Sequence, residues 1–339
     1  MGVEAAIAEV LPTPDTGVLV LQMGGPATLR EVRPFIRRML SDPAIVPMPA
    51  VFRVPLAALV SWLRSRRVRR HYEAIGGGSP ITRISLMQAA RLEEALLAAG
   101  RPMPVLLGQR YTAPTIGQAF RRAVELGLRR LIVLPLYPQY SGTTTGSAFA
   151  EVRRVARREA PGTALEFIED YADHPGYARA VAETIREALQ KVSPGARART
   201  RVLFSAHGLP VRMVGRGDPY PARVQATVEA VLAQMGPREV EDHRVCFQSR
   251  VGPVRWIEPD TRHAIREAAR DGVPALVLVP ISFVSDHLET LYELDIQYRE
   301  QAIALGVREF VRAASLNDSR AFAGALAQVV LARYAAAIR

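Results

Sequence analysis

The sequence predicts an α/β protein built on two parallel β-sheets, and three observations lead to this prediction. Short apolar runs alternate with segments of helical periodicity, a pattern typical of parallel sheets covered by helices. Four such runs occur in each half of the chain. The two halves also resemble each other in detail. We therefore expect two similar four-stranded parallel sheets, each with helices on both faces.

The expected strands are runs of apolar residues, several of which lead directly into polar or glycine-containing turns. Those of the first half cover 17–23, 104–108, 130–136 and 164–170. Those of the second half cover 201–207, 243–249, 275–281 and 308–314.

Two helix boundaries can be predicted from local signals. Thr28 and Glu31 have the spacing of a capping box, which predicts a helix over 28–40. Gly100 predicts the end of a helix over 84–99, because glycine readily adopts the left-handed conformation that terminates helices.

The internal similarity of the halves brings two residues into equivalent places. "VLVLQMGGP" (18–26) aligns with "VLFSAHGLP" (202–210), so Met23 corresponds to His207. Ligands of open α/β sheets bind beyond the carboxyl ends of the strands, which is where both residues fall. We therefore expect the functional site in the cleft between the two halves.

Composition excludes several classes of protein. The chain has 339 residues, 49% of them hydrophobic, which is enough for two domains, but it has no apolar run long enough to span a membrane. The first sixteen residues lack the features of a secretory signal. The single cysteine, Cys246, excludes an internal disulfide and any all-cysteine metal site. The net charge of +11 comes almost entirely from arginine, but no nucleic-acid-binding motif accompanies it.

Histidines and carboxylates follow two apolar strands of the second half. His207 ends "VLFSAH", and "ALVLVPI" leads into "SFVSDHLETLYELD", which contains His287 and Glu289. If these strands are neighbours, the three side chains can lie close together. Histidine with carboxylates suits a borderline divalent cation such as Fe²⁺, and histidine also suits proton abstraction near neutral pH.

Glu289, Glu293 and Gln297 recur at every fourth residue, which places them on one face of a helix. An ordinary solvated face would explain acids at this spacing. The functional alternative is a polar track that leads a cation from solvent to His207.

The segment 48–80 combines apolar residues and Trp62 with five arginines between Arg64 and Arg70. A fully buried helix is excluded, because its arginine end could not be buried without partners. The segment is typical of an interfacial helix at a membrane surface. Alternatively, the arginines hold the carboxylates of an amphipathic substrate. The hydroxyl-rich turn at 137–147 could bind an anion through backbone N–H groups.

Taken together, these motifs resemble ferrochelatase, of the protohaem-forming, proteobacterial-like type. The resemblance extends from about residue 17 to 300 and includes "LQMGGPATLREVRPFIRRMLSDPAIV", "IGGGSPI", "LPLYPQYSGTTTGS", "LFSAHGLPVRMVGRGDPYP", "QSRVGPVRWIEPDT" and "VPISFVSDHLETLYELDI". It implies two Rossmann-like, chelatase-type domains, over 14–172 and 173–339, with the membrane lip at 48–70. It also implies insertion of Fe²⁺ into protoporphyrin IX, the last step of protohaem synthesis.

The resemblance implies roles for individual residues. His207 and Glu289 match the catalytic and iron-binding pair, and Asp286, His287 and Glu293 match the polar track. Gln297 stands where some members have an acid. Residues that match the porphyrin pocket, including the region that holds the propionates, are Met23, Arg64, Arg67, Tyr72, Ser79, Arg110, Tyr111 and Trp256. A tyrosine stands at the position of Met23 in members that act on coproporphyrin, so Met23 favours protoporphyrin IX.

The chain departs from animal members of that family, which carry a [2Fe-2S] cluster. Gly142 stands at the position of one cluster cysteine, and no cysteine-bearing extension follows. We therefore expect no permanently bound cofactor and no iron–sulfur cluster, with Fe²⁺ as a substrate. The expected location is the cytoplasm, in reversible contact with the inner membrane and without nucleic acid, while the oligomeric state stays open.

Two other functions fit part of these observations. One is a chelatase for cobalt or for a uroporphyrin-type ring, although so polar a substrate would not need the apolar segment at 48–63. The other is a haem- or porphyrin-binding protein without catalytic activity.

Overall fold

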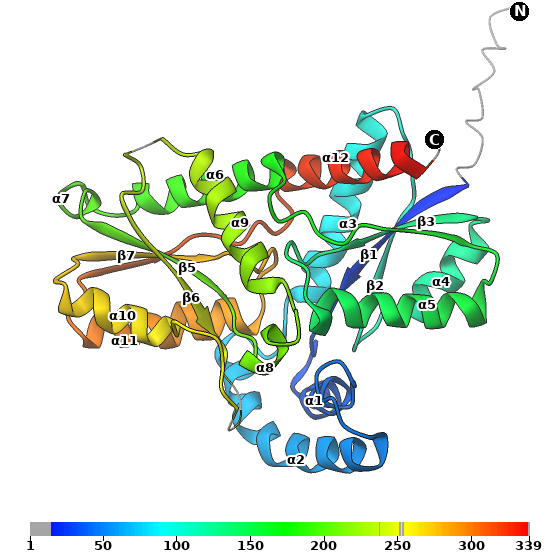
Figure 1. The fold of residues 1–339 in the computed structure, drawn as a ribbon, viewed down its shortest axis with the longest axis horizontal. Coiled ribbons are helices and arrows are strands. Elements are labelled where there is room, and N and C mark those ends of the chain that lie inside the picture. Colours follow the sequence, from blue (N-terminus) through cyan, green and yellow to red (C-terminus); the bar gives the residue numbers. More distant parts are fainter. Residues whose placement is uncertain (1–14, 237, 251, 253, 338–339) are drawn as a thin grey trace, which may run out of the picture.

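The computed structural model describes residues 15–236, 238–250, 252 and 254–337, and it contains two four-stranded parallel sheets (Figure 1). The ends of the predicted domains at 14 and 339 lie outside these residues. The fold class predicted from the sequence is confirmed.

The two sheets have the same topology. The first has the order β2-β1-β3-β4, formed by β1 (Thr16–Gln22), β2 (Val105–Gln109), β3 (Arg130–Pro135) and β4 (Ala164–Phe167). The second has the order β6-β5-β7-β8, formed by β5 (Thr200–His207), β6 (Asp242–Gln248), β7 (Ala275–Pro280) and β8 (Glu309–Arg312). All eight predicted strands are present. Because β1 and β5 occupy equivalent places, Met23 and His207 both lie at the carboxyl end of a central strand.

The helices of the first half are η1 (Leu29–Glu31), α1 (Val32–Leu40), α2 (Ala50–Ala74), α3 (Ile81–Ala98), α4 (Ile116–Glu125), η2 (Gly142–Gly146) and α5 (Ser147–Glu159). Those of the second half are α6 (Pro175–Gln190), α7 (Pro194–Arg197), α8 (Val211–Val214), α9 (Tyr220–Ala233), α10 (Thr261–Arg270), η3 (Glu289–Tyr298), α11 (Arg299–Ala304) and α12 (Arg320–Ala337).

The central strands β1, β3, β5 and β7 are buried on both faces, which explains why they are apolar without alternation. In β1, Leu19 and Leu21 pack with α4 and α5. The alternate residues Val18 and Val20 face the opposite way, into a core that also contains Val202 and Phe204 of β5. One continuous core therefore joins the inner faces of the two sheets.

The C-terminal helix crosses from the second half to the first. Helix α12 packs against α3 and α6 and contacts β3 and β4 of the first sheet (Figure 1). A division of the chain at 172/173 therefore separates the sheets but not the helices that cover them.

Helices α1 and α2 project from the first half beyond its sheet (Figure 1). They pack on each other through small or polar residues of α2, among which Ala57, Ser61 and Ser65 are buried. The large apolar residues of α2 point outward instead: Val51 is 70% exposed, Trp62 59% and Leu63 61%.

Of the two predicted helix boundaries, one is wrong and one is correct. The capping box was wrong, because Thr28 makes no side-chain cap bond and Glu31 instead accepts a hydrogen bond from the amide of Ala27 at 2.9 Å. The intervening 3₁₀ turn delays the α-helix to Val32 and changes the spacing. The helix end at Gly100 is correct: Gly100 has φ +72° and Arg101 N donates to the carbonyl of Leu96.

The turn at 137–147 is occupied by a carboxylate of the protein itself. Gly142 N and Ser141 Oγ each donate to Asp218 Oδ2 at 2.9 Å, which joins the two halves. Two donors of the turn that was predicted to bind an external anion therefore bind a carboxylate of the protein instead.

Candidate functional site

His207 lies at the carboxyl end of β5, beside the segment that follows β7. The two strands are paired in register up to Ser205 and Pro280, so the chain beyond β7 reaches the level of His207. There the amide of His207 donates to Ser282 Oγ at 3.0 Å. Strands β5 and β7 are therefore neighbours, as the sequence prediction required.

Gly208 lets the chain pass closely between neighbouring groups. A Cβ at this position would lie 2.8 Å from the carbonyl oxygen of Gln248 and 3.2 Å from the Trp256 ring. The glycine therefore allows Trp256 to approach the end of the strand, where its ring lies edge-on to His207 with 6.4 Å between centroids.

Glu289 lies between two histidines. Its Oε1 is 3.5 Å from Nε2 of His207, and its Oε2 is 3.3 Å from Nε2 of His287. The carboxylate thus contacts one ring with each oxygen.

Backbone carbonyls fix the tautomers of both histidines. His207 Nδ1 lies 2.6 Å from the carbonyl oxygen of Gly208, and His287 Nδ1 lies 3.0 Å from that of Ser285. A carbonyl oxygen only accepts, so each Nδ1 carries the hydrogen. In the neutral rings both Nε2 lone pairs then point to the Glu289 carboxylate. Such a cluster of acceptors requires a proton or a cation.

The electrostatics of the cluster agree with this geometry. Burial lowers the pKa of His207, but the Glu289 carboxylate and the Gly208 carbonyl outweigh burial and raise the pKa to about 9. Burial raises the pKa of Glu289, but His207 and His287 hold it far below its usual range. At neutral pH the resting site therefore holds an imidazolium at His207 beside a carboxylate.

Glu293 lies one turn further along η3 and is held by the end of β6. Its Oε2 accepts from Ser249 Oγ at 2.6 Å and from Gln248 Nε2 at 3.3 Å. Burial and the charge of Glu289 raise the pKa of Glu293 against these donors. Ser249 has φ +64°, an uncommon conformation for a residue other than glycine, and strain of this kind is frequent at functional sites.

The helix that carries both acids is a π-helix over its whole length from Glu289 to Tyr298. The spacing of four residues keeps Glu289 and Glu293 on one face in this geometry as well, because a π turn contains about 4.4 residues. The face predicted from the sequence is therefore correct, but the type of helix is different.

Asp286 was predicted to belong to the same track, but its carboxylate is fully engaged elsewhere. It accepts hydrogen bonds from Thr290, Arg312, Ser315 and Asn317. Burial raises the pKa of Asp286, but Arg312 and these donors lower it below its usual value. Asp286 lies next to the site without facing the cluster of His207, His287 and Glu289.

Met23, Tyr72 and Tyr111 form one apolar cluster with helix α1, and Leu288 of the second half packs against it. Tyr72 is close enough to Glu289 that burial and then the charge of that acid raise its pKa. His71 also stacks on Tyr292 of η3 with 4.1 Å between ring centroids. The structure therefore brings Met23, Tyr72 and the second-half cluster together.

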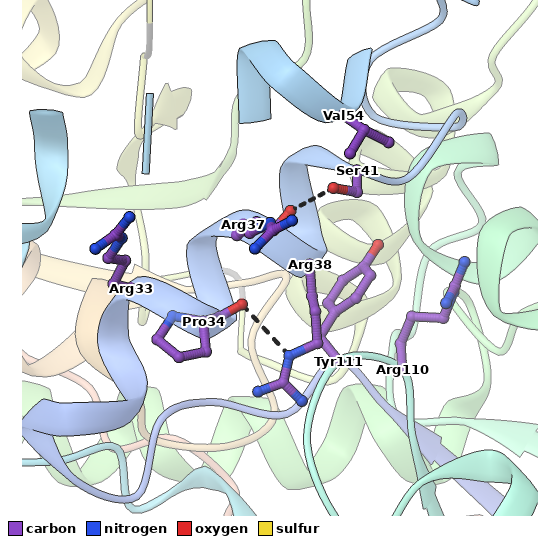
Figure 2. A pocket seen from close by; sticks show the side chains of 8 residues that line it. All are labelled: Arg33, Pro34, Arg37, Arg38, Ser41, Val54, Arg110 and Tyr111. Carbon is purple, nitrogen blue, oxygen red and sulfur yellow. Dashed lines mark hydrogen bonds between the residues drawn. The ribbon is translucent and has the colours of Figure 1, made fainter. Parts of the chain in front are cut away.

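Arg110 and Tyr111 line a pocket of about 710 Å³ beside α1 (Figure 2). Asp42 anchors both: Arg110 Nη2 lies 2.9 Å from Asp42 Oδ2, and Tyr111 Oη donates to the same oxygen at 2.7 Å. Arg33, Arg37 and Arg38 of α1 line the pocket too (Figure 2). The sequence prediction missed these three and Asp42, although arginines four residues apart on one helix gave a signal.

The predicted pocket residues Ser79, Arg64 and Arg67 do not line this pocket. Ser79 lines a separate hollow of about 510 Å³ with Thr82, Arg83 and Leu86. On α2, Arg64 is half-buried and Arg67 is exposed; burial and then the charge of Arg67 lower the pKa of Arg64. Phe283, which the sequence prediction also missed, lies edge-on to His207 at 6.3 Å and 4.7 Å from the His287 ring centroid.

Comparison with known proteins agrees with the fold. The ferrochelatase family model matches residues 15–334. A ferrochelatase of Gloeobacter violaceus is 42% identical over 322 residues, which are 94% of this chain and 97% of the relative. One of Geotalea daltonii is 40% identical over 316 residues, covering 93% of this chain and 97% of the relative. Among solved structures, SirB from Bacillus subtilis with Fe3+ has a TM-score of 0.57 at 15% identity, over 95% of this chain and 96% of that one, which shows a shared fold.

Two equivalent parallel-sheet halves, with a histidine–carboxylate cluster at the carboxyl ends of the strands, define a chelatase-type protein. The comparisons make the assignment specific, and the chain belongs to the ferrochelatase family. It is therefore a metal-inserting chelatase of haem biosynthesis.

Proposed function

We propose that this ferrochelatase binds protoporphyrin IX between Met23 and His207 and inserts Fe²⁺ to form protohaem, with His207 and Glu289 as the acid–base and iron-binding pair. The observation that supports these roles best is the position of Glu289 between two Nε2 atoms whose tautomers are fixed.

Metallation requires the removal of two pyrrole protons. His207 accepts a proton only at Nε2, because Nδ1 already carries one, so a second acceptor is needed. Glu289 contacts His207 directly, and Glu293 with its raised pKa lies behind it. A cation arriving at this cluster repels the proton of the imidazolium, which frees Nε2 for the porphyrin. Released protons then pass by way of Glu289 to Glu293, whose raised pKa suits it to hold a proton, and from there to solvent.

The substrate assignment is tested by anaerobic insertion of Fe²⁺ into protoporphyrin and coproporphyrin in parallel. We expect protohaem formation with the higher kcat/KM, since Met23 presents an apolar surface to the ring. Faster metallation of coproporphyrin, or turnover only with cobalt and a uroporphyrin-type ring, contradicts the assignment. Tight porphyrin binding without any metallation identifies a binding protein instead.

We also propose that α2 rests reversibly on the cytoplasmic face of the inner membrane. Residues 30–70 contain ten arginines and two acids, which is a net charge of +8 out of +11 for the whole chain. The same region exposes the apolar side chains of α2, whose packing face is formed by small residues. Exposed apolar residues beside arginines favour a surface of anionic lipid. No helix of the described residues is long and apolar enough to cross a bilayer.

We further propose that the protein contains no iron–sulfur cluster. Cys246 is fully buried in β6, its Sγ accepts from Thr261 Oγ1 at 3.3 Å, and burial raises its pKa to about 12. Such clusters ordinarily take about four thiolates, whereas this chain has one cysteine. Acid-labile sulfide in stoichiometric amount in the purified protein would contradict the proposal.

A further inference from the structure

Arg312, the last residue of β8, joins two carboxylates of the segment that carries the site. Its Nε donates to Asp295 Oδ2 at 2.9 Å, and its Nη1 donates to Asp286 Oδ1 at 3.1 Å. Asp286 precedes η3 and Asp295 lies within it, so Arg312 contacts the segment on both sides of Glu289 and Glu293. The arginine side chain is only 12% exposed.

The Asp286 end of this connection is saturated. Its Oδ1 also accepts from Ser315 at 2.8 Å and from Thr290 at 3.0 Å, while Oδ2 accepts from Asn317 at 3.0 Å. Its amide donates back to Asn317 Oδ1 at 2.9 Å. A carboxylate with this many donors is fixed in place and has little capacity to carry a cation or a proton.

The fixed carboxylate is linked to the catalytic cluster through Thr290. The buried Thr290 hydroxyl donates to Asp286 and accepts from the amide of His287 at 3.0 Å. On its other side, His287 Nδ1 donates to the carbonyl of Ser285, whose hydroxyl is bound to Gln88 of the first half. The direction of the His287 ring, and with it the contact to Glu289, therefore depends on this network.

The network supports an unusual helix. A π-helix of ten residues is unusual, because such turns mostly occur singly. Asp295 lies in the middle of η3, and its contact with Arg312 ties the helix to the edge of the second sheet. Support from β8 therefore holds in place the helix that carries Glu289 and Glu293.

We propose that Arg312 is a positioning residue for metal insertion: by holding Asp286 and Asp295 together, it sets Glu289 at the contact distance from both His207 and His287. The proposal rests on the proposed function. It gives Asp286 a role in orientation in place of the role in the polar track that the sequence suggested.

The test compares Arg312→Gln with Arg201→Gln. Arg201 is a matched control, because it also joins two aspartates of the second half, Asp242 at 2.7 Å and Asp271 at 2.9 Å, but at the amino end of β5.

The kcat for Fe²⁺ insertion is expressed per porphyrin-binding site, counted by fluorescence titration with protoporphyrin IX. We expect Arg312→Gln to lose about 10- to 100-fold in kcat, the usual cost of removing an outer-shell partner, with little change in KM. Arg201→Gln should keep its kcat.

A second readout separates positioning from loss of stability. In a Glu289→Gln background the further change Arg312→Gln should have little effect on kcat, because the group that it positions is already disabled. Independent, multiplied losses in the double variant would overturn the proposal, and so would equal losses in the Arg312 and Arg201 variants. If Arg312→Gln does not fold, Asp295→Asn removes one end of the connection, and it should lower kcat in the same direction.

If the proposed function is wrong, the unmodified protein itself will not insert Fe²⁺, and this result is distinct from failure of the positioning role. The positioning role then still has a readout, the ring NMR signals of His207 and His287. These signals should shift in the Arg312 variant and not in the Arg201 variant, and unchanged signals in both would overturn the proposal.

Discussion

At the scale of single residues, two backbone carbonyls determine the chemistry of this site. The carbonyls of Gly208 and Ser285 each take an Nδ1–H, so both Nε2 atoms are left to Glu289. A histidine with a free choice of tautomer could turn its lone pair away from the substrate. Here only Nε2 is available to a pyrrole proton or a metal.

We expect His207→Ala to lose most of its metallation activity while it still binds porphyrin, because Met23, Trp256 and α2 supply apolar contact. A positioned base contributes about 10²–10⁴-fold, so kcat should fall by at least that factor. Glu289→Gln keeps the shape and removes the charge, and kcat should also fall strongly. Steady-state kinetics and fluorescence titration with porphyrin measure the two effects separately.

The α10 pair His263 and Glu267, 3.4 Å apart and half-exposed, provides the control. His263→Ala should leave kcat unchanged. If His207 and Glu289 act as one unit, the double variant should be scarcely worse than the worse single variant. Near wild-type turnover in a folded His207→Ala protein would refute the assignment.

The raised pKa of His207 also predicts how stability depends on pH. The pKa is about 9 in the folded chain and about 6.5 in an unfolded one. The contribution to the free energy of unfolding is therefore complete below about pH 6.5 and is lost as the pH rises through about 9. The side chain is 37% exposed, and solvent screening limits the contribution to no more than about 1 kcal/mol.

Urea unfolding of the wild type and His207→Gln at about pH 6 and pH 9.5 measures this contribution. The stability difference between the two proteins should be larger at the lower pH. An equal difference at both values, or a larger one at the higher value, would show that the proton is not held by the folded site.

The sequence predicted the residues that stand directly at strand ends, and it missed those that tertiary packing supplies. His207, His287 and Glu289 could be found because parallel strands bring their carboxyl ends together. Asp286 was placed in the track because it matches a residue of that track in the family, whereas its partner Arg312 lies 26 positions further along the chain, on β8. Nothing in the local sequence pairs these two residues.

At the scale of elements, the strands have a clear sequence signal, whereas the helix type of η3 has none. The central strands could be predicted because burial on both faces makes them continuously apolar. The type of η3 could not, because residues four apart share a face in an α-helix and in a π-helix. The pocket at α1 could not be predicted either, since only the fold shows that Arg33, Arg37 and Arg38 share it with Arg110.

Helix α2 carries the membrane prediction. Replacing Leu56, Leu59 and Trp62 with serine should weaken binding to vesicles that contain anionic lipid, and the fold should persist because all three side chains point outward. Wild-type binding should also weaken as the salt concentration rises above about 0.15 M, where the screening length falls below about 8 Å. Vesicle co-sedimentation measures both effects, and equal binding by the triple variant contradicts the membrane role of α2.

Arg64 and Arg70 separate lipid binding from substrate binding on the same helix. Arg64 is half-buried and Arg70 is exposed. Arg64→Ala should raise the KM for porphyrin and leave vesicle binding unchanged, whereas Arg70→Ala should do the reverse. The opposite assignment would show that the exposed arginines serve the propionates.

At the scale of the whole molecule, the two halves are alike in topology but not independent in packing. The main core contains residues of both sheets, and α12 from the end of the chain covers β3 and β4 of the first half. Polar contacts cross between the halves as well, among them Gln139 Nε2 to the carbonyl of Ile281 at 3.1 Å and Gln88 Nε2 to that of Asn317 at 2.9 Å. The two sheets therefore share a single core.

This shared core predicts that the halves unfold together. A domain with its own core can unfold alone, but loss of either sheet here exposes the inner face of the other and frees α12. Pulsed hydrogen exchange across a urea series, read by mass spectrometry on peptides from β1 and β5, should give one midpoint for both strands. Independent domains would instead give a first-half midpoint separated from that of the second half, with β5 still protected after β1 has exchanged. Removal of α12 by a stop codon at Arg320 should lower the protection of β1 as well as that of β5, since this helix packs on the first sheet although it belongs to the second half of the chain.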